Sequence, residues 1–334
     1  MKAGEVRSAI RGGRDPAAEL KAEIQNGITF GEFADVFLKS LVPGFKNETS
    51  ERDWKRDLEV RCQPLRPKSL GGITTDDVLA ILSPMIYRTA RETRSRIERV
   101  LDAAESRGLR SGRNPAEWKN LKPLLPRVKR AKRHHKAAPY KDVPEIVRRL
   151  REKHSAADTT VNRVAEYVIL TAVRTSEARF MRVREIDFKA RLWTIPEERM
   201  KVGDQHEVPL CDGALAILKA AIPKDVEPDA YVFAGQWSKD HSRPLGMNAV
   251  LHALKNVYPA MTTHGCRSSF RDWAGDETNF PREIAEMALA HGVGDEVEQA
   301  YRRGTALAKR RKLMEAWSRY IEGGSSSGVP MRVA

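Results

Sequence analysis

The chain has few cysteines and no long apolar run. Cys62, Cys211 and Cys266 are far apart and form no C-x-x-C pair. This spacing argues against a disulfide framework and against a zinc site, and it favours a reducing, cytoplasmic setting. No apolar run approaches the roughly 18 residues of a transmembrane helix, and the N-terminal residues lack the apolar core of a signal peptide. A membrane partner is therefore not expected.

Positive charge is what the chain has in excess. Among its 334 residues, 59 Lys and Arg outnumber 45 Asp and Glu, which gives a formal net charge of +14. A charge of this size destabilises a compact state through self-repulsion unless a polyanion is the natural partner. Nucleic acid is the expected partner, and a merely soluble basic protein is the alternative. The length fits two domains.

The first part of the chain reads as a small helical unit. Thr29 and Glu32 have capping-box spacing in "TFGEFADVFLKSL", which predicts the start of a helix. Ser50 is predicted to cap a second helix over 50–61. Two more helices are predicted over 74–82 and about 86–107, the last of them stopped by Gly108.

The sequence predicts five regions in all. The stretch "RVKRAKRHHK" lies in a basic segment with little periodicity, which indicates a linker. It is either a solvated loop or a loop that lies along DNA phosphates. In the second case each Lys or Arg would strengthen binding by releasing counterions from the DNA, and this interpretation is favoured. The regions are a polar N-terminal stretch at 1–25, a helical domain at 26–125, the linker at 126–140, a second domain at 141–322 and a disordered tail at 323–334.

The second domain is predicted to be helical around a small antiparallel sheet, so the fold class is mainly α with a small β-sheet. Three β segments, "EIDF", "RLWTIP" and "HEVPL", are short and β-branched or aromatic, and Gly203 marks a turn between the last two. His206 is expected to be a packed or hairpin histidine rather than a catalyst. Helices are predicted at 143–153, 158–173, 212–222, 246–257, 264–275, 281–290, 294–302 and 305–321.

Polar side chains suited to phosphate chemistry recur in a fixed order through this domain. Each has an ordinary explanation when taken alone: an arginine can pair with a nearby glutamate, a turn lysine is usually solvated, and a tyrosine usually packs in a core or an interface. Their joint order, within the expected alternation of helix and strand, is much harder to obtain by chance. The set is Arg174 with Glu177, Lys201, His264 with Arg267, His291 and Tyr301.

This order resembles the tyrosine recombinases, the integrase family of phages and mobile elements. The likeness is strongest to integrases of satellite phages and genomic islands. It is carried by "HGCRSSFRDWAGDE", "LAHGVGDEVEQAYRR" and "RRKLMEAWSRYI", and it covers about residues 11–321. Members of the family also carry a small N-terminal domain that binds arm-type DNA sites. Only its last helix has a counterpart here, in "EVRSAIRGGRDPAAELK", so residues 1–25 are expected to be a remnant of that region or a flexible tail.

The resemblance assigns a role to each residue. Two arginines, Arg174 and Arg267, are expected to clamp the scissile phosphate, because a guanidinium matches two phosphate oxygens and stays charged. Tyr301 is expected to be the nucleophile and Lys201 the general acid. The other roles are a general base or phosphate donor for His264, a second donor for His291, and orientation of an arginine or histidine by Glu177.

The resemblance also implies a reaction and partners. The expected activity is site-specific recombination through a 3′-phosphotyrosyl intermediate, with neither a metal nor another cofactor. The expected partner is double-stranded DNA with attachment-type sites, which the two domains would hold in a C-shaped clamp. The protein is expected to be a homo-tetramer on DNA and a monomer or weak oligomer when free. An excisionase or a host DNA-bending protein would assist it.

The rival readings are a type IB-like topoisomerase and a non-catalytic DNA-binding regulator. The final helix is expected either to pack on its own domain or to dock on a neighbouring subunit, with a slight preference for docking.

Overall fold

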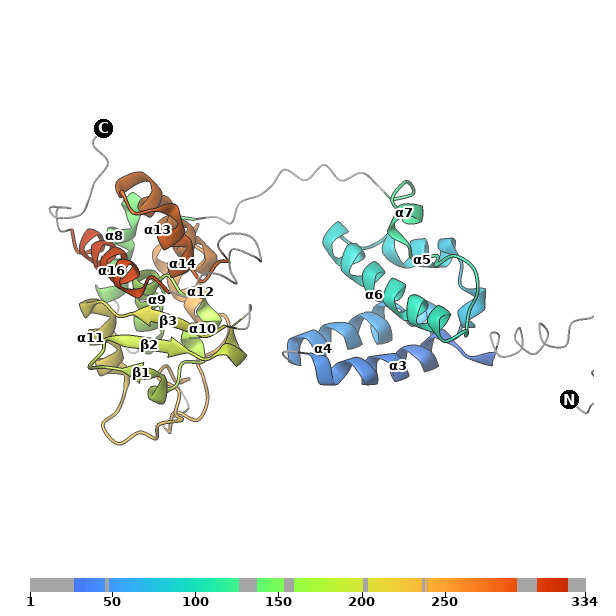
Figure 1. The fold of residues 1–334 in the computed structure, drawn as a ribbon, viewed down its shortest axis with the longest axis horizontal. Coiled ribbons are helices and arrows are strands. Elements are labelled where there is room, and N and C mark those ends of the chain that lie inside the picture. The colour runs from blue at the N-terminus through green and yellow to red at the C-terminus, as the bar shows by residue number, and fades with distance from the viewer. Residues whose placement is uncertain are drawn as a thin grey trace, which may run out of the picture. The chain divides into compact units, whose positions relative to one another are not determined.

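The computed structural model describes residues 27–45, 48–125, 137–152, 159–200, 204–235, 238, 240–292 and 305–323. These residues divide into two compact units, one ending at residue 125 and one beginning at residue 137 (Figure 1). The first unit is helical, and the second surrounds a three-stranded antiparallel sheet with helices. The predicted fold class, mainly α with a small antiparallel sheet, is confirmed.

The N-terminal unit is built around the long helix α6 (Tyr87–Ser106), which packs against α3 (Phe30–Leu41) and α5 (Thr75–Leu82). The predicted capping box at Thr29 and Glu32 is confirmed, since each residue's side chain accepts a hydrogen bond from the other's backbone N–H. Gly108 follows α6 in the left-handed region, with φ +71°, as the helix stop predicts. A short helix, α7 (Trp118–Leu121), completes the unit.

The predicted helix start at Ser50 is wrong. Helix α4 (Glu48–Lys55) begins two residues earlier and contains Ser50. Glu48 and Glu51 lie in its first turn, where negative charge suits the positive end of the helix dipole. The helix then widens into a π-helical turn at Arg56–Arg61, which buries Asp57. Such turns often occur where a side chain is redirected for a specific contact, and here the redirected side chain is a carboxylate.

The C-terminal unit has α9 (Thr159–Thr171) at its centre. This helix packs against α8 (Val143–Glu152), α11 (Asp212–Ala221), α12 (Ala249–Val257) and α13 (Thr263–Glu277). Apolar residues all round a helix indicate burial, and the run from Val164 to Leu170 is fully buried except at Glu166, which is 3% exposed. In the sequence, the short helix α10 (Thr175–Arg179) lies between α9 and the first strand of the sheet.

The sheet has the order β1 (Ile186–Asp187), β2 (Leu192–Ile195), β3 (His206–Pro209). In its register Ile186 faces Trp193, and Ile195 faces His206. A single 3₁₀ turn, Glu197–Arg199, follows β2. The predicted turn at Gly203 lies outside the described residues, as does the predicted helix over 294–302.

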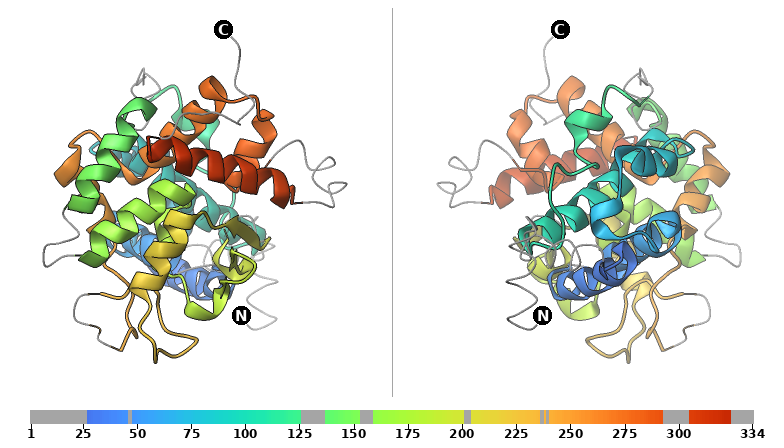
Figure 2. Two further views of the ribbon diagram at one scale, coloured as in Figure 1. Left: turned by 90° about the vertical axis from the view of Figure 1, so that its left-hand side faces the viewer. Right: turned by 90° about the vertical axis from the view of Figure 1, so that its right-hand side faces the viewer.

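Helix α16 (Leu307–Ile321) packs on its own C-terminal unit, against α8, α9, α14 (Arg282–Ala288) and β3. Figure 2 shows it, in red, crossing the green helices. Trp317 is fully buried and donates a hydrogen bond from Nε1 to the Ile169 carbonyl at 2.9 Å. It also lies 4.9 Å from the ring centre of Trp273. In the single chain α16 thus packs within its own subunit, and docking on a neighbouring subunit in a DNA-bound tetramer stays a prediction.

None of the helices in the described part of the chain is long and apolar enough to cross a membrane.

Candidate active site

Arg174 is held in place by Glu177. Helix α9 ends at Thr171, and Arg174, whose backbone is extended, is the N-cap of α10. Its backbone N–H donates to Glu177 Oε2, and its Nη1 donates to Oε1, both at 2.7 Å. The Glu177 side chain is 4% exposed and that of Arg174 is 30% exposed. The predicted ion pair therefore exists, and it anchors one edge of a guanidinium that still reaches solvent.

Arg267 comes from α13 and points into the domain. Thr262 caps this helix by accepting the Gly265 N–H at 2.9 Å. His264 and Arg267 follow in the first turns, as predicted. His264 is exposed, whereas Arg267 is only 4% exposed. The helix therefore presents one of the two side chains at the surface and buries the other.

Arg267 is bound by backbone carbonyls rather than by a carboxylate. Its Nη1 donates to the Ala172 carbonyl and its Nη2 to the Leu289 carbonyl, each at 2.5 Å. Arg174 Nη2 makes a similar contact, at 3.3 Å, with the Ala290 carbonyl. Ala172 and Ala290 both adopt left-handed backbone conformations, with φ of 52° and 49°. Because such a conformation is uncommon for a residue with a Cβ atom, it marks two places where the fold turns a carbonyl towards an arginine.

His291 joins the same cluster. Its Nε2 lies 3.1 Å from Arg267 Nη2, and its Nδ1 lies 2.7 Å from Glu286 Oε2. A guanidinium can only donate, so Nε2 accepts and Nδ1 carries the proton that Glu286 accepts. Glu286 also accepts a hydrogen bond from Arg271 Nε at 2.7 Å. Burial would raise the pKa of Glu286, but the bonds from Arg271 and His291 lower it overall, so this carboxylate stays ionised and fixes the histidine ring.

The cluster is cationic and short of acceptors. Burial first, and the nearby charge of Arg174 second, lower the pKa of Arg267 to about 10. Its Nε is also buried without a hydrogen-bond partner. A buried donor left unpaired costs free energy, and two neighbouring guanidinium groups repel each other. An anion placed between them would relieve both costs.

His206, at the start of β3, faces the same charges. Burial lowers its pKa to about 3, and the positive charges of Arg310, Arg267 and Arg174 contribute to the shift, against the opposing effect of a hydrogen bond with the Ala288 backbone. The ring is therefore neutral at ordinary pH. The sequence indicated a packed histidine, and the structure adds that it lies beside the segment that also carries the Leu289 and Ala290 carbonyls.

Two predicted site residues, Lys201 and Tyr301, lie outside the described residues. The structure thus brings together Arg174, Glu177, Arg267 and His291. Sequence reasoning missed Glu286 and the carbonyls of Ala172, Leu289 and Ala290. No local sequence pattern marks these groups. Every residue has a backbone carbonyl, and nothing in the sequence distinguishes Glu286 from the other glutamates.

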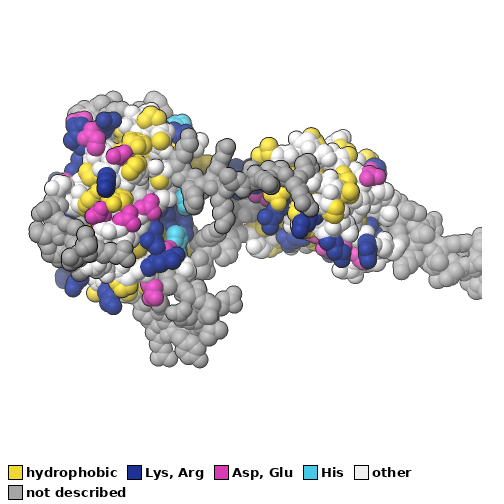
Figure 3. Space-filling model, turned by 90° about the horizontal axis from the view of Figure 1, so that it is seen from above, with side chains coloured by type: hydrophobic (Ala, Val, Ile, Leu, Met, Phe, Trp, Pro, Cys, Tyr) yellow, Lys and Arg dark blue, Asp and Glu magenta, His cyan; other side chains and the backbone are white. Residues whose placement is uncertain are grey.

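On one flank of the C-terminal unit, histidines lie among Lys and Arg side chains (Figure 3). Among the described residues, no group of three or more His, Cys, Asp or Glu side chains is placed to hold a metal ion. The arrangement is therefore that of an anion site built from arginine and histidine.

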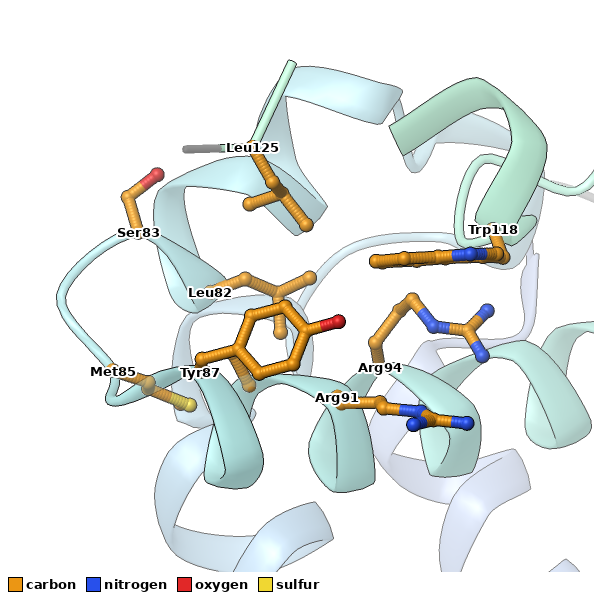
Figure 4. Close-up of a pocket in the computed structure, with 9 residues that line it drawn as sticks. Leu82, Ser83, Met85, Tyr87, Arg91, Arg94, Trp118 and Leu125 are labelled. Carbon is orange, nitrogen blue, oxygen red and sulfur yellow. The ribbon is translucent and has the colours of Figure 1, made fainter. Parts of the chain in front are cut away.

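The N-terminal unit has a separate small pocket between α5, α6 and α7. Trp118 stacks on Arg94, with the guanidinium carbon 5.4 Å from the ring centre, and Leu82, Met85 and Leu125 supply apolar walls (Figure 4). Arg94 is committed to the Ala116 carbonyl and to Glu98. The other polar residues that line the pocket are Ser83, Tyr87 and Arg91, and the Ser83 hydroxyl donates to the Leu79 carbonyl.

Family models match both units of the chain. The model described as the phage integrase family matches residues 139–306, just over half of the chain, and the phage integrase central domain matches residues 30–121.

Curated relatives agree with these matches. Prophage integrase IntA of Escherichia coli (strain K12) is 36% identical over 163 residues, which cover 48% of this chain and 38% of that protein. Prophage integrase IntZ of the same strain is 29% identical over 335 residues, covering 96% of this chain and 79% of IntZ. The integrase of enterobacteria phage P4 is 30% identical over 208 residues, covering 57% of this chain and 46% of the phage protein. The chain thus spans less than half the length of two of these three relatives.

Solved structures share the fold at low identity. A lambda integrase dimer bound to a COC' core site matches with a TM-score of 0.62 and 15% identity, covering 90% of this chain and 85% of that one. The Tn1549 transposon integrase in complex with circular intermediate DNA matches with a TM-score of 0.58 and 12% identity, covering 83% of this chain and all of that one. With half of the chain matched by one family model, and with integrases among the relatives and the structural neighbours alike, the chain belongs to the phage integrase family and is of the tyrosine recombinase kind.

Proposed function

We propose that the protein is a site-specific DNA recombinase that cuts and rejoins DNA through a covalent 3′-phosphotyrosyl link. One observation carries the proposal: Arg174 and Arg267, 93 residues apart in the sequence, bind the adjacent backbone carbonyls of Ala290 and Leu289. Within the described part of the chain, the Arg267 guanidinium binds two carbonyls and His291 and no carboxylate. Such a pair suits a phosphodiester that gains negative charge during reaction.

The chemistry follows from where that charge develops. Attack on a phosphodiester makes a five-coordinate phosphorus whose extra charge sits on the non-bridging oxygens, so catalysis is mainly positioning and electrostatic stabilisation. A bound phosphate would meet the outward edge of Arg174, whose side chain is 30% exposed, and Arg267, which is 4% exposed, would contribute its positive charge from within the domain. His291, held by Glu286, would keep Arg267 in position and add a donor if its ring reorients.

The remaining roles fall to the other family-type residues. In the proposed step the Tyr301 phenol oxygen forms the bond to phosphorus as the bond to the 5′-oxygen breaks. Lys201 gives a proton to that leaving oxygen, and His264 acts as general base or phosphate donor. Glu177 holds Arg174. Resealing reverses these steps on the 5′-hydroxyl of a partner strand, so the bond energy is conserved and no cofactor is needed.

The substrate and assembly follow from the same proposal. Residues 26–125 would bind core DNA, residues 126–140 would link the domains, and residues 141–322 would catalyse, so that the domains form a C-shaped clamp on duplex DNA with attachment-type sites. The active form would be a homo-tetramer, with an excisionase or a DNA-bending protein as helper, in the bacterial cytoplasm at the nucleoid. Support comes from a structural neighbour, a lambda integrase tetramer bound to a Holliday junction, which matches with a TM-score of 0.62.

The central test is the covalent adduct. Incubation with a suicide DNA duplex should give a protein–DNA adduct that maps to Tyr301, and Tyr301→Phe should bind the same DNA and form none. Tyr320→Phe, on α16, is the matched control and should form the adduct normally. An adduct on another tyrosine would refute the assignment of the nucleophile, and no adduct with the unmodified protein would favour a DNA-binding regulator.

A second measurement separates recombination from topoisomerase chemistry. The topoisomerase alternative shares the cleavage step but lacks partner exchange. Two duplexes carrying the same site and different labels should yield joint products with the unmodified protein. Relaxation of supercoiled DNA without any joint product would favour the topoisomerase.

A further inference from the structure

A buried ion pair lies at the base of the β2–β3 segment. Glu185, at the end of the 3₁₀ turn before β1, binds Arg199 through Oε2 and Nη2. The same Oε2 accepts the indole N–H of Trp193 at 2.9 Å. The side chains of Glu185 and Arg199 are 7% and 22% exposed, and Trp193 is fully buried in β2. One carboxylate therefore ties together the start of β1, the middle of β2 and the turn after β2.

Arg199 also reaches α10. Its Nη1 donates to the backbone carbonyl of Glu177 at 3.4 Å, and Glu177 is the residue that holds Arg174. In the sequence Arg199 stands two residues before Lys201. The guanidinium thus connects the helix that carries the Arg174–Glu177 pair to the chain segment that leads into Lys201.

Stability alone is a poor reason for such a pair. Taking two charges out of water costs several kcal/mol, and well-packed apolar residues of similar volume often serve a fold as well or better. Burial outweighs the attraction of Glu185 here, since it lowers the pKa of Arg199 overall. The Nε of Arg199 is also buried without a partner. What the pair supplies is fixed geometry, because a planar guanidinium bound on two edges cannot rotate.

We infer that Glu185 and Arg199 are positioning residues that set the base of the Lys201 segment relative to Arg174, so that proton donation to the leaving oxygen occurs at the phosphate that the arginines hold. The inference rests on the proposed function. It assigns no contact between Arg199 and DNA. Its consequence is specific: loss of the pair should weaken the step that depends on Lys201 and should spare steps that do not.

The variant Arg199→Lys tests this. A lysine keeps the charge, but it cannot bind Glu185 and the Glu177 carbonyl with one rigid fork. Cleavage is measured in single turnover on two duplexes that differ only in the bridging 5′-atom, oxygen or sulfur. A displacement of about 1 Å can cost roughly 10²-fold in rate, so the oxygen substrate should be cut about 10–100-fold more slowly. A thiol has a reference pKa of about 8.5 and leaves without help from an acid, so the sulfur substrate should be cut within about threefold of the normal rate.

A double variant gives the sharper readout. If Arg199 acts through Lys201, adding Arg199→Lys to Lys201→Ala should cause no further loss on the oxygen substrate, because effects on one unit are not additive. Asp212→Asn is the matched control. It removes the exposed pair with Arg191 at the opposite end of the β2–β3 ladder, with Asp212 92% exposed, and it should change neither rate. Glu185→Gln, which keeps an oxygen for Trp193, should repeat the Arg199→Lys pattern if the lysine variant folds poorly.

The outcomes separate this inference from the proposed function. Equal slowing of both substrates, a full additional loss in the double variant, or an unchanged oxygen rate would each overturn the positioning role while leaving the adduct on Tyr301 intact. Failure of sulfur to rescue Lys201→Ala would instead remove Lys201 as the acid, and this inference with it. Absence of any adduct with the unmodified protein would refute the proposed function itself.

Discussion

Two arginine clusters, one in each unit, use the same side chain in opposite ways. In the N-terminal unit, the fully buried Asp57 binds both Arg61 and Arg96. Thr93 Oγ1 adds a hydrogen bond to Asp57 at 3.1 Å. In the C-terminal unit, Arg267 is 4% exposed, and its bonds go to the carbonyls of Ala172 and Leu289 and to His291.

The difference lies in what neutralises the charge. Asp57 cancels one of the two positive charges in its cluster and ties the π-helical turn to α6, while Arg61 and Arg96 stay partly exposed to water. Carbonyl dipoles hold a guanidinium in place without cancelling its charge. The catalytic cluster is therefore rigid and still attracts an anion. Burial of arginine is thus informative only together with the identity of its acceptors.

The largest expected effect comes from Arg174→Lys. Lysine keeps the charge but loses the bidentate fork, and the loss of one donor to a developing oxyanion costs about 10²–10³ in rate. Single-turnover cleavage at saturating DNA measures it. The same substitution at Arg96, in the other cluster, should leave that rate within about threefold. Equal losses in the two variants would erase the distinction between the clusters.

Asp57→Asn should show the reverse pattern. The amide keeps the shape of the side chain but gives up the charge that Arg61 and Arg96 share, and hydrogen bonds to charged groups contribute about 1.5–3 kcal/mol each. A loss of about 2–3 kcal/mol in the free energy of unfolding of the N-terminal unit is expected, by urea titration. The rate of cleavage at saturating DNA should be unchanged. A stable Asp57→Asn protein with slow cleavage would place this cluster in the reaction.

The acid stability of the C-terminal unit should depend on His206. Its folded pKa of about 3 lies below the reference value of 6.5, so between these values the unfolded chain binds more protons and stability falls as the pH falls. From pH 7 to pH 5 this contributes a loss of roughly 1–2 kcal/mol. His206→Gln should remove that part of the slope in urea titrations at the two pH values. An unchanged slope would show that the ring is not held neutral beside Arg267 and Arg310.

The smallest expected effect is at Ala290. Its φ of 49° suits glycine, whose backbone adopts this region at no steric cost. Glycine relieves the backbone strain in the folded state, but it also gives the unfolded chain more conformational freedom, which costs about 0.4–1 kcal/mol. The net change in the free energy of unfolding should therefore be within about 0.5 kcal/mol. Ala253→Gly, in the middle of α12, is the matched control and should cost about 1 kcal/mol. A comparable loss at Ala290 would mean that its methyl group has a packing role.

Local patterns in the sequence predicted most elements of this fold. The box at Thr29 and Glu32, the stop at Gly108 and the three short β segments depend on residues only a few positions apart, and these predictions are confirmed. The choice of Ser50 was wrong because the helix begins two residues earlier, with Glu48 and Glu51 in its first turn. The π-helical turn at Asp57 was missed, because its bonds to Arg96 and Thr93 join separate helices.

The sequence by itself determined which side chains are available to the site and in what order they occur: Arg174 with Glu177, then His264 with Arg267, then His291. Their spacing within one helix or one cap is a local property, and it identified the family before any coordinates. Only the tertiary structure decided that Arg267 binds carbonyls instead of a carboxylate, that Glu286 fixes His291, and that Arg199 connects β2 to α10. These contacts join segments that are distant in the sequence and depend on backbone groups that every residue shares, so only packing of the core brings them together.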